Sequence, residues 1–214
     1  MRTSFAFVVI CGSVACGQES QSQMWDFEDA AVGKVPSGWT AAKTGDGEGS
    51  AWRVVEDKSA PSGARVLAQL AAGPSPLFNL CLADRTNFQD LELSVAFKAV
   101  DGKVDQGGGV VWRCLDANNY YIACFNPLED NFRVYKVVDG KRTQLATREN
   151  LKAPAGEWHT LAIKMRGHAM ECFLNGTKHL EATDSTFTKG SRIGLWTKAD
   201  AQTHFDSIEV KALE

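Results

Sequence analysis

Short segments of alternating apolar and polar residues follow one another through the second half of the chain, between residues 107 and 210. They are rich in β-branched and aromatic residues and are separated by turn sequences, a pattern typical of antiparallel strands. Two of the turns are the dipeptides Asp139-Gly140 and Asn175-Gly176, which favour the positive φ angles of two-residue hairpins. The pattern predicts an all-β sandwich and no long helix.

The N-terminal half contains shorter and less regular strand candidates. They are separated by long loops rich in Gly and Pro, so we expect this half to wrap the sandwich and to form its edges. The cleanest alternation then begins at residue 91 and directs Leu91, Leu93, Val95 and Phe97 into the core. The expected strands of the N-terminal half cover residues 25–27, 39–42, 52–55, 65–68 and 77–82.

The same alternation sorts the last strands into an inner and an outer face. The residues predicted to face the core are Leu161, Ile163, Met165, Met170, Cys172, Leu174, Ile193 and Leu195. Trp158, Phe173 and Trp196 then point outward together with charged neighbours, and we expect one continuous platform. An exposed ring offers a flat apolar surface to a sugar, and charged neighbours bond its hydroxyls. The alternative is that the N-terminal segments cover these aromatic residues, which then only pack.

The length and composition of the chain fit a single domain, and its net charge argues against nucleic-acid binding. The 214 residues are 44% hydrophobic, enough for a single β domain, which we place at residues 24–214. The net charge of −3 gives no basic stripe for nucleic acid.

The first residues, 1–17, are predicted to be a signal peptide. Arg2 precedes an apolar run that is too short to span a bilayer, which takes about 20 residues. Two kinds of signal peptide fit this segment. One is cleaved by ordinary signal peptidase after small residues near Cys16, and the other is a lipoprotein signal that ends before Cys16. We therefore expect a periplasmic protein, a cell-surface lipoprotein or a secreted protein, with a lipid on Cys16 as the only membrane contact.

Four cysteines remain in the predicted domain, Cys81, Cys114, Cys124 and Cys172, and an oxidising compartment allows three pairings. Cys114 and Cys124 share strand parity across a turn, so a bridge between them is expected if Leu115 lies opposite Ala123. Buried free thiols are the alternative.

Several common catalytic signatures are missing from the sequence. The four histidines are scattered and no Cys-x-x-Cys occurs, which argues against a zinc enzyme. There is no Gly-x-Ser-x-Gly elbow, no phosphate-binding Gly loop and no Glu-x-Asp-x-x-Glu pair of the kind that family-16 glycoside hydrolases carry on a strand. The remaining polar candidates lie on or beside turns, where a solvated loop residue is the alternative for each: Arg113, Asn119, Tyr120, Tyr121, Glu129 and Asp130.

A series of segments resembles one bacterial family, the 3-keto-disaccharide hydrolase domain. The segments are GGVVWR, DANNYY, NPLEDNFRVYKVVDGKRTQLA, APAGEWHTL, FLNGTK, IGLWTKAD and HFDSIEV, and the likeness runs from about Met24 to the C-terminus. The resemblance implies a concanavalin A-like jelly roll of two antiparallel sheets and an exported protein that acts on or recognises a glycan or disaccharide. Two positions depart from the family pattern: Cys124 stands where an Arg is common, which removes a ligand contact, and Cys114 replaces an apolar or aromatic residue. The two cysteines together support the bridge.

The chemistry implied by this resemblance begins at a ketone on C3 of a sugar. The ketone acidifies the hydrogen on C2, so a general base starts elimination of the glycosidic leaving group, and water then adds to the enone. Such a site needs a base, a donor for the enolate oxygen and an acid for the leaving group. Our catalytic candidates are Asp200, Lys198, Glu129 and His204, and our substrate-binding candidates are Arg113, Asn119, Tyr121, Trp158 and Trp196.

Two other functions stay open, a non-catalytic carbohydrate-binding module and a structural sandwich in an envelope assembly. The resemblance also implies a structural calcium ion where the first and last strands meet. Asp26, Glu28 and Asp206 are its expected ligands, and surface acidity without a metal is the alternative.

Overall fold

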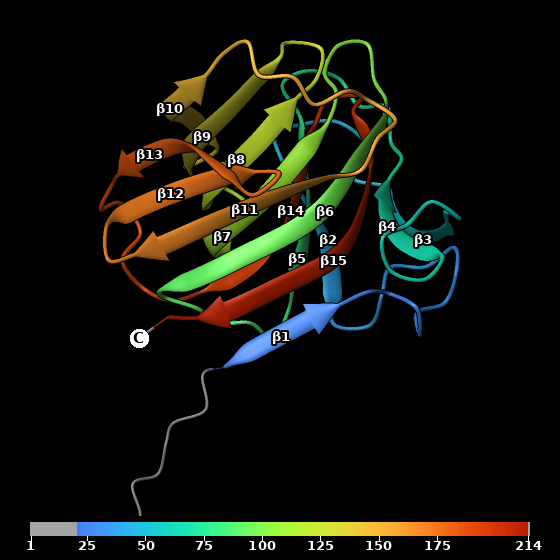
Figure 1. Cartoon of the computed structure of the whole chain (residues 1–214), viewed down its shortest axis with the longest axis horizontal. Helices are drawn as coiled ribbons and strands as arrows, with labels where there is room; N and C mark the ends of the chain where they lie inside the picture. Colours follow the sequence, from blue (N-terminus) through green and yellow to red (C-terminus); the bar gives the residue numbers. More distant parts are fainter. Residues whose placement is uncertain (1–20, 214) are drawn as a thin grey trace, which may run out of the picture.

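The computed structural model describes residues 21–213, which form two antiparallel β-sheets and contain no helix. Figure 1 looks onto the eight-stranded sheet, with the seven-stranded sheet behind it. The eight-stranded sheet contains β1 (Ser22–Trp25), β3 (Trp52–Glu56), β4 (Arg65–Gln69), β6 (Leu91–Asp101), β11 (His159–Arg166), β12 (Ala169–Leu174), β13 (Thr177–Thr183) and β15 (Gln202–Ala212). The seven-stranded sheet contains β2 (Trp39–Thr44), β5 (Phe78–Ala83), β7 (Gly108–Asp116), β8 (Asn119–Asn126), β9 (Asn131–Val138), β10 (Lys141–Arg148) and β14 (Arg192–Lys198).

The all-β sandwich is therefore confirmed, whereas the N-terminal strands form the edges only in part, because β4 and β5 lie inside the sheets and β13 and β10 form the opposite edges. The strand orders are β13-β12-β11-β6-β15-β4-β3, with β1 on β15, and β10-β9-β8-β7-β14-β5-β2. Thus β3 and β2 form edges, and each long central strand pairs with a partner distant in sequence. No helix in the described residues is long and apolar enough to cross a membrane. The expected signal peptide, residues 1–17, lies outside the described part of the chain.

Both predicted hairpin turns are present. Asp139 and Gly140 have φ angles of 49° and 77° and join β9 to β10, while Asn175 and Gly176 have the same pair of angles and join β12 to β13. Positive φ at two consecutive residues is the geometry that matches the twist of the flanking strands.

The main core lies between the sheets, and the predicted alternation is confirmed. Leu93, Val95 and Phe97 of β6 pack there with Leu161, Ile163 and Met165 of β11, and with inward residues of β12 and β14. Burial of these residues from both sheets supplies the main driving force that holds the two layers together.

A second apolar cluster covers the outer face of the seven-stranded sheet. It includes Phe78, Ile122, Tyr135 and Trp196, all of them buried. The expected single platform is therefore wrong. Trp196 lies on the outer face of the seven-stranded sheet, whereas Phe173, on β12, belongs to the eight-stranded sheet. Strand parity distinguishes inside from outside but does not identify the sheet to which a strand belongs.

The expected bridge between Cys114 and Cys124 is also wrong, since all four described cysteines are free and buried. The register pairs Cys124 with Gly109 and Ala123 with Val110, while a bulge interrupts the pairing between Trp112 and Asp116. Cys114 therefore stands five positions beyond Gly109 along β7, a separation of roughly 16 Å in a strand. A disulfide allows at most about 7 Å between Cα atoms.

Candidate functional site

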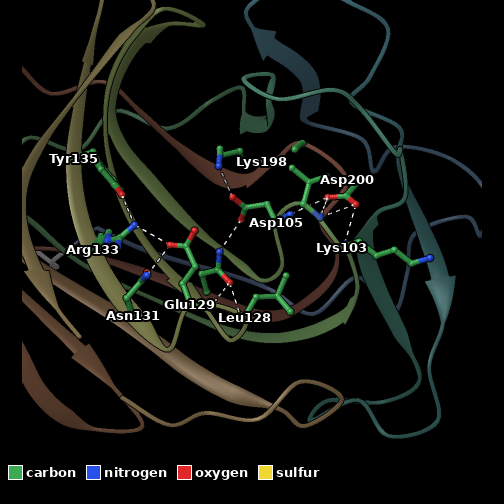
Figure 2. Close-up of polar contacts among 12 residues, drawn as sticks. Lys103, Asp105, Leu128, Glu129, Asn131, Arg133, Tyr135, Lys198 and Asp200 are labelled. Carbon is green, nitrogen blue, oxygen red and sulfur yellow. Dashed lines mark hydrogen bonds and ion pairs between the residues drawn. The ribbon is translucent and has the colours of Figure 1, made fainter. Parts of the chain in front are cut away.

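Charged and aromatic side chains converge in a cleft on the outer face of the seven-stranded sheet (Figure 2). They come from the loop before β7, the β8–β9 loop and strands β8, β9, β10 and β14, so the sheet fixes most of them. The residues whose side chains carry chemistry there are Asp105, Asn126, Glu129, Asn131, Arg133, Tyr135, Arg142, Trp196 and Lys198.

An ion pair forms one part of the cleft. Lys198 Nζ lies 2.6 Å from Asp105 Oδ2, and Asn126 Nδ2 donates to Asp105 Oδ1 at 3.2 Å. Asp105 is only 7% exposed. Burial raises the pKa of Asp105 above its ordinary value, although the Lys198 ammonium acts in the opposite direction. The carboxylate thus holds the ammonium in a fixed place beside the cleft.

A second carboxylate group faces the same cleft with one oxygen available. Glu129 Oε2 accepts hydrogen bonds from Asn131 Nδ2 at 2.7 Å and from Arg133 Nη1 at 2.9 Å. Glu129 Oε1 has no hydrogen-bond partner among residues 21–213, and the side chain is 46% exposed. Arg133 Nη1 also lies 3.5 Å from the Tyr135 hydroxyl. Burial raises the pKa of Tyr135, so the phenol keeps its proton near neutral pH.

Arg142 forms the wall between this cleft and a neighbouring pocket. Its guanidinium carbon lies 4.2 Å from the centre of the Tyr135 ring and 5.1 Å from that of Phe78. The neighbouring pocket has a volume of about 260 Å³ and shares Arg142 and Lys198 with the cleft, whose own volume is about 50 Å³. Thr44, Gly45, Pro76, Phe78 and Gly140 complete its lining.

The structure brings two of the four catalytic candidates, Lys198 and Glu129, into the cleft. Asp200 lies nearby but is occupied by backbone N–H groups of Lys103 at 2.8 Å, Val104 at 3.1 Å and Asp105 at 2.9 Å (Figure 2). Although burial acts against it, these bonds lower the pKa of Asp200. Asp200 therefore supports the loop that carries Asp105 and is not placed as a free base.

His204 is remote from the cleft, because β15 belongs to the eight-stranded sheet. Its Nδ1 lies 2.8 Å from Asp57 Oδ2, and Asp57 also pairs with Lys98. Burial lowers the pKa of His204, even though Asp57 favours the charged form. This placement separates His204 from the other catalytic candidates.

Three of the substrate-binding candidates have structural contacts instead. Arg113 is 1% exposed and donates to Gln89 O, Phe187 O, Gly167 O and Asp90 Oδ1. Tyr121 lies in the core between the sheets and donates to Asp184 Oδ1 at 2.7 Å. Asn119 donates to the Asp116 carboxylate in the β7–β8 turn. None of these placements fits direct contact with a ligand.

The two tryptophan candidates lie apart, Trp158 in the loop before β11 of the eight-stranded sheet and Trp196 on β14 of the seven-stranded sheet. Trp158 precedes β11, donates from Nε1 to Ser59 Oγ at 3.1 Å and has Lys98 Nζ 5.1 Å from its ring centre. Trp196 does line the cleft, but it is 2% exposed and packs against Phe78 with ring centroids 5.4 Å apart. It therefore supports the cleft from below instead of offering a stacking surface.

The expected calcium ligands are bound to backbone groups. Glu28 Oε1 accepts from Ala64 N and Arg65 N, and Asp206 Oδ2 accepts from Ser62 N. Asp26 Oδ1 accepts from Glu28 N. Residues 21–213 contain no group of three or more His, Cys, Asp or Glu side chains placed to hold a metal ion. Calcium binding stays a prediction that this geometry does not support.

Two larger hollows, of about 570 and 330 Å³, lie on the outer face of the eight-stranded sheet. Their charges pair across strands, as in Lys164–Glu92 at 2.8 Å and Lys178–Glu171 at 2.9 Å. Such cross-strand pairs are typical of a solvated sheet face. We therefore place the candidate site in the smaller cleft, where partly buried charges and an unengaged carboxylate oxygen converge.

Sequence reasoning did not identify Asp105, Arg133, Tyr135 and Arg142 as site residues. Alternation along residues 131–138 places Arg133 and Tyr135 on one face, so this signal was present in the sequence. Asp105 lies in a loop and carries no periodic signal.

The fold belongs to the concanavalin A-like jelly rolls. The structure matches the carbohydrate-binding module CBM66 from Bacillus subtilis with a TM-score of 0.66 and 18% identity, covering 82% of this chain and 96% of that one. It also matches a Bacillus licheniformis beta-glucanase with a TM-score of 0.60 and 12% identity, covering 92% and 100%. The cellulose-induced protein Cip1 matches with a TM-score of 0.65 and 11% identity, covering 89% and 97%.

The sequence identifies the family. Residues 24–211 match the 3-keto-alpha-glucoside-1,2-lyase-like domain, and the chain belongs to this family. This agrees with the resemblance carried by the sequence motifs. No protein of curated function matches the sequence.

Proposed function

We propose that this protein cleaves 3-keto glycosides by elimination across C1 and C2 of the oxidised sugar. The family description supports this substrate class. The observation that carries the proposal is the convergence, in one cleft, of the Lys198–Asp105 ion pair and of Glu129 with an unengaged oxygen. These are the two groups that enolate chemistry needs, a cation for the oxygen and a base for the proton.

In the first step, Glu129 Oε1 removes the proton from C2, and the electron pair of that C–H bond forms the enolate C2=C3–O⁻. The Lys198 ammonium stabilises the enolate oxygen, and Asp105 keeps the ammonium in position. Because the ammonium is held before the reaction, little reorganisation is needed as negative charge develops.

In the second step, the enolate collapses back to the ketone, a double bond forms between C1 and C2, and the bond from C1 to the leaving oxygen breaks. The Tyr135 hydroxyl donates its proton to that oxygen; burial raises the pKa of Tyr135, so the phenol still carries this proton at neutral pH. Arg133 donates to both Glu129 and Tyr135 and so holds the two side chains next to each other. Water then adds across the enone: the Tyr135 phenolate takes a proton from the water as its oxygen bonds to C1, and protonated Glu129 returns its proton to C2, which completes net hydrolysis and restores both groups.

The test measures the release of 4-nitrophenol from 4-nitrophenyl 3-keto-α-glucoside and, in the same assay, the absorbance of the enone intermediate. We expect Glu129→Gln and Lys198→Met to lower kcat by about a hundredfold or more, since each removes a group that acts in the transition state. Glu171→Gln is the matched control, because Glu171 pairs with Lys178 on the eight-stranded sheet. Thermal melting of each variant separates loss of activity from loss of folding.

Absence of release above a heat-treated control would overturn the catalytic proposal. Binding of the glycoside without release, weakened in the two cleft variants, would instead assign the same cleft to a non-catalytic carbohydrate-binding module. The wild-type binding isotherm is therefore measured alongside turnover.

A further inference from the structure

The cations of the cleft are not equally neutralised. Lys198 pairs with Asp105, and Arg133 pairs with Glu129 and Glu149. Arg142 has neither a carboxylate partner nor a hydrogen-bond acceptor among the described residues, although it is partly buried. The two pockets that meet at Arg142 therefore contain one guanidinium that no carboxylate of residues 21–213 contacts directly. Asp105 lies close enough to interact with its charge but pairs with Lys198.

Two aromatic rings hold this guanidinium in place, and its N–H donors have no acceptor among the described residues. The Tyr135 and Phe78 rings lie 4.2 and 5.1 Å from the guanidinium carbon. Aromatic rings attract a guanidinium through its face, whereas its N–H donors point outward in the plane and need oxygen acceptors. A fork of donors held in this way matches the paired oxygens of a carboxylate or sulfate.

The neighbouring pocket supplies the room for a group bearing such oxygens. Its volume of about 260 Å³ is several times that of the cleft itself, and it is lined by Phe78, Pro76 and the Thr44 side chain. Lys198 and Arg142 line both spaces. A glycoside whose reacting carbons lie beside Lys198 would therefore extend its leaving group toward Phe78 and Arg142.

We propose that this pocket is the leaving-group subsite and that Arg142 selects a leaving group bearing an oxyanion, a carboxylate or a sulfate. The assignment of the pocket to the leaving group rests on the proposed elimination. The preference for an oxyanion rests on Arg142 itself.

The test compares three 3-keto-α-glucosides with 4-carboxyphenyl, 4-sulfooxyphenyl and neutral 4-carbamoylphenyl leaving groups. The ratio of kcat/KM for each anionic substrate to that of the carboxamide is measured in wild type, Arg142→Met and Arg142→Lys. Dividing the wild-type ratio by the variant ratio cancels the intrinsic reactivity of each leaving group. We expect that quotient to be about tenfold or more for Arg142→Met, as for one charge-assisted hydrogen bond, and smaller for Arg142→Lys.

Arg148→Met is the matched control, because Arg148 lies on the same strand, β10, and is exposed. It should leave all ratios at the wild-type values. A larger quotient for the carboxylate or for the sulfate identifies which oxyanion the subsite takes. Ratios that are the same in Arg142→Met and wild type would overturn the inference while leaving the elimination intact.

If none of the three substrates is cleaved, the proposed function has failed and the inference is decided by calorimetric binding of the same compounds. Tighter binding of the anionic glycosides that Arg142→Met abolishes would support the oxyanion preference. Equal binding of all three would overturn it. Melting curves of the variants verify that each remains folded.

Discussion

Cys114 and Cys124 lie in the apolar cluster on the outer face of the seven-stranded sheet, and neither is bridged. Burial raises the pKa of each thiol to about 12. The thiolate is the reactive form of cysteine, so near pH 8 roughly one such thiol in ten thousand is reactive. These cysteines therefore behave as small apolar residues.

We predict that iodoacetamide near pH 8 leaves Cys114 and Cys124 unmodified in the native protein and alkylates both in urea. Peptide mass spectrometry measures the modified fraction at each site. An unreduced digest supplies the control, because a linked peptide containing both residues would contradict the observed register. Since the pKa is raised, the native rate should increase about tenfold for each unit of rising pH while the fold persists.

Single residues show where sequence reasoning was sufficient. Strand parity predicts that Lys198 faces outward, and Glu129 is a candidate because it lies in a loop directly after a strand. Both residues line the cleft. Asp105 was not predicted, because its loop is held by Asp200, which is distant in the sequence. Asp200 is a catalytic candidate because it carries a carboxylate, but backbone N–H groups donate hydrogen bonds to that carboxylate. A sequence does not reveal such contacts.

At the scale of elements, the hairpin between β9 and β10 connects the fold to the cleft. Its turn, Asp139-Gly140, directly precedes β10, and Arg142 is the second residue of that strand. Gly140 itself lines the leaving-group pocket, and a Cβ atom built there would lie 3.7 Å from Thr44 Cγ2. The turn therefore affects both stability and the shape of the pocket.

The second hairpin provides a matched comparison for this turn. Gly140 and Gly176 both have φ of 77°, and nothing lies within 4 Å of a Cβ built on Gly176. We predict that Gly140→Ala and Gly176→Ala each lower the free energy of unfolding by about 1 kcal/mol, because a left-handed conformation disfavours a side chain. Denaturant titration measures this loss.

Only Gly140→Ala should also weaken glycoside binding, since its methyl group contacts the pocket wall. Calorimetric affinities of the two variants decide this point. Equal affinities would show that the ligand does not contact the side of the pocket formed by Gly140 and Thr44.

Elements were more predictable than their pairing. Asp-Gly and Asn-Gly define hairpins locally, and alternation defined the inward residues of β6, β11, β12 and β14. The pairing of β6 with β15 and of β7 with β14 joins segments far apart in the chain. No local pattern encodes such pairings, and for this reason the predicted platform combined residues from two sheets.

The whole molecule presents two outer faces of different chemistry. On the eight-stranded sheet, charges pair with one another across strands, and Asp57 joins Lys98 to His204. On the seven-stranded sheet, a buried apolar layer supports a cleft in which the Arg142 guanidinium and one Glu129 oxygen have no hydrogen-bond partner within residues 21–213. Residues predicted for the site were distributed over both faces, but only the second face brings several of them together.

This contrast predicts that function depends on one face of the sandwich. Tyr135→Phe removes only the hydroxyl beside Arg133, and we expect kcat on a 3-keto glycoside with an alkyl leaving group to fall about tenfold or more, because an alkoxide leaves poorly without proton donation to its oxygen. Phe173→Ala and Trp158→Ala, on the eight-stranded side, remove larger aromatic surfaces and should change kcat and KM less than about twofold. Initial rates at several substrate concentrations measure both constants. A loss of binding in Phe173→Ala or Trp158→Ala with an unaltered Tyr135→Phe variant would place the glycan on the opposite sheet.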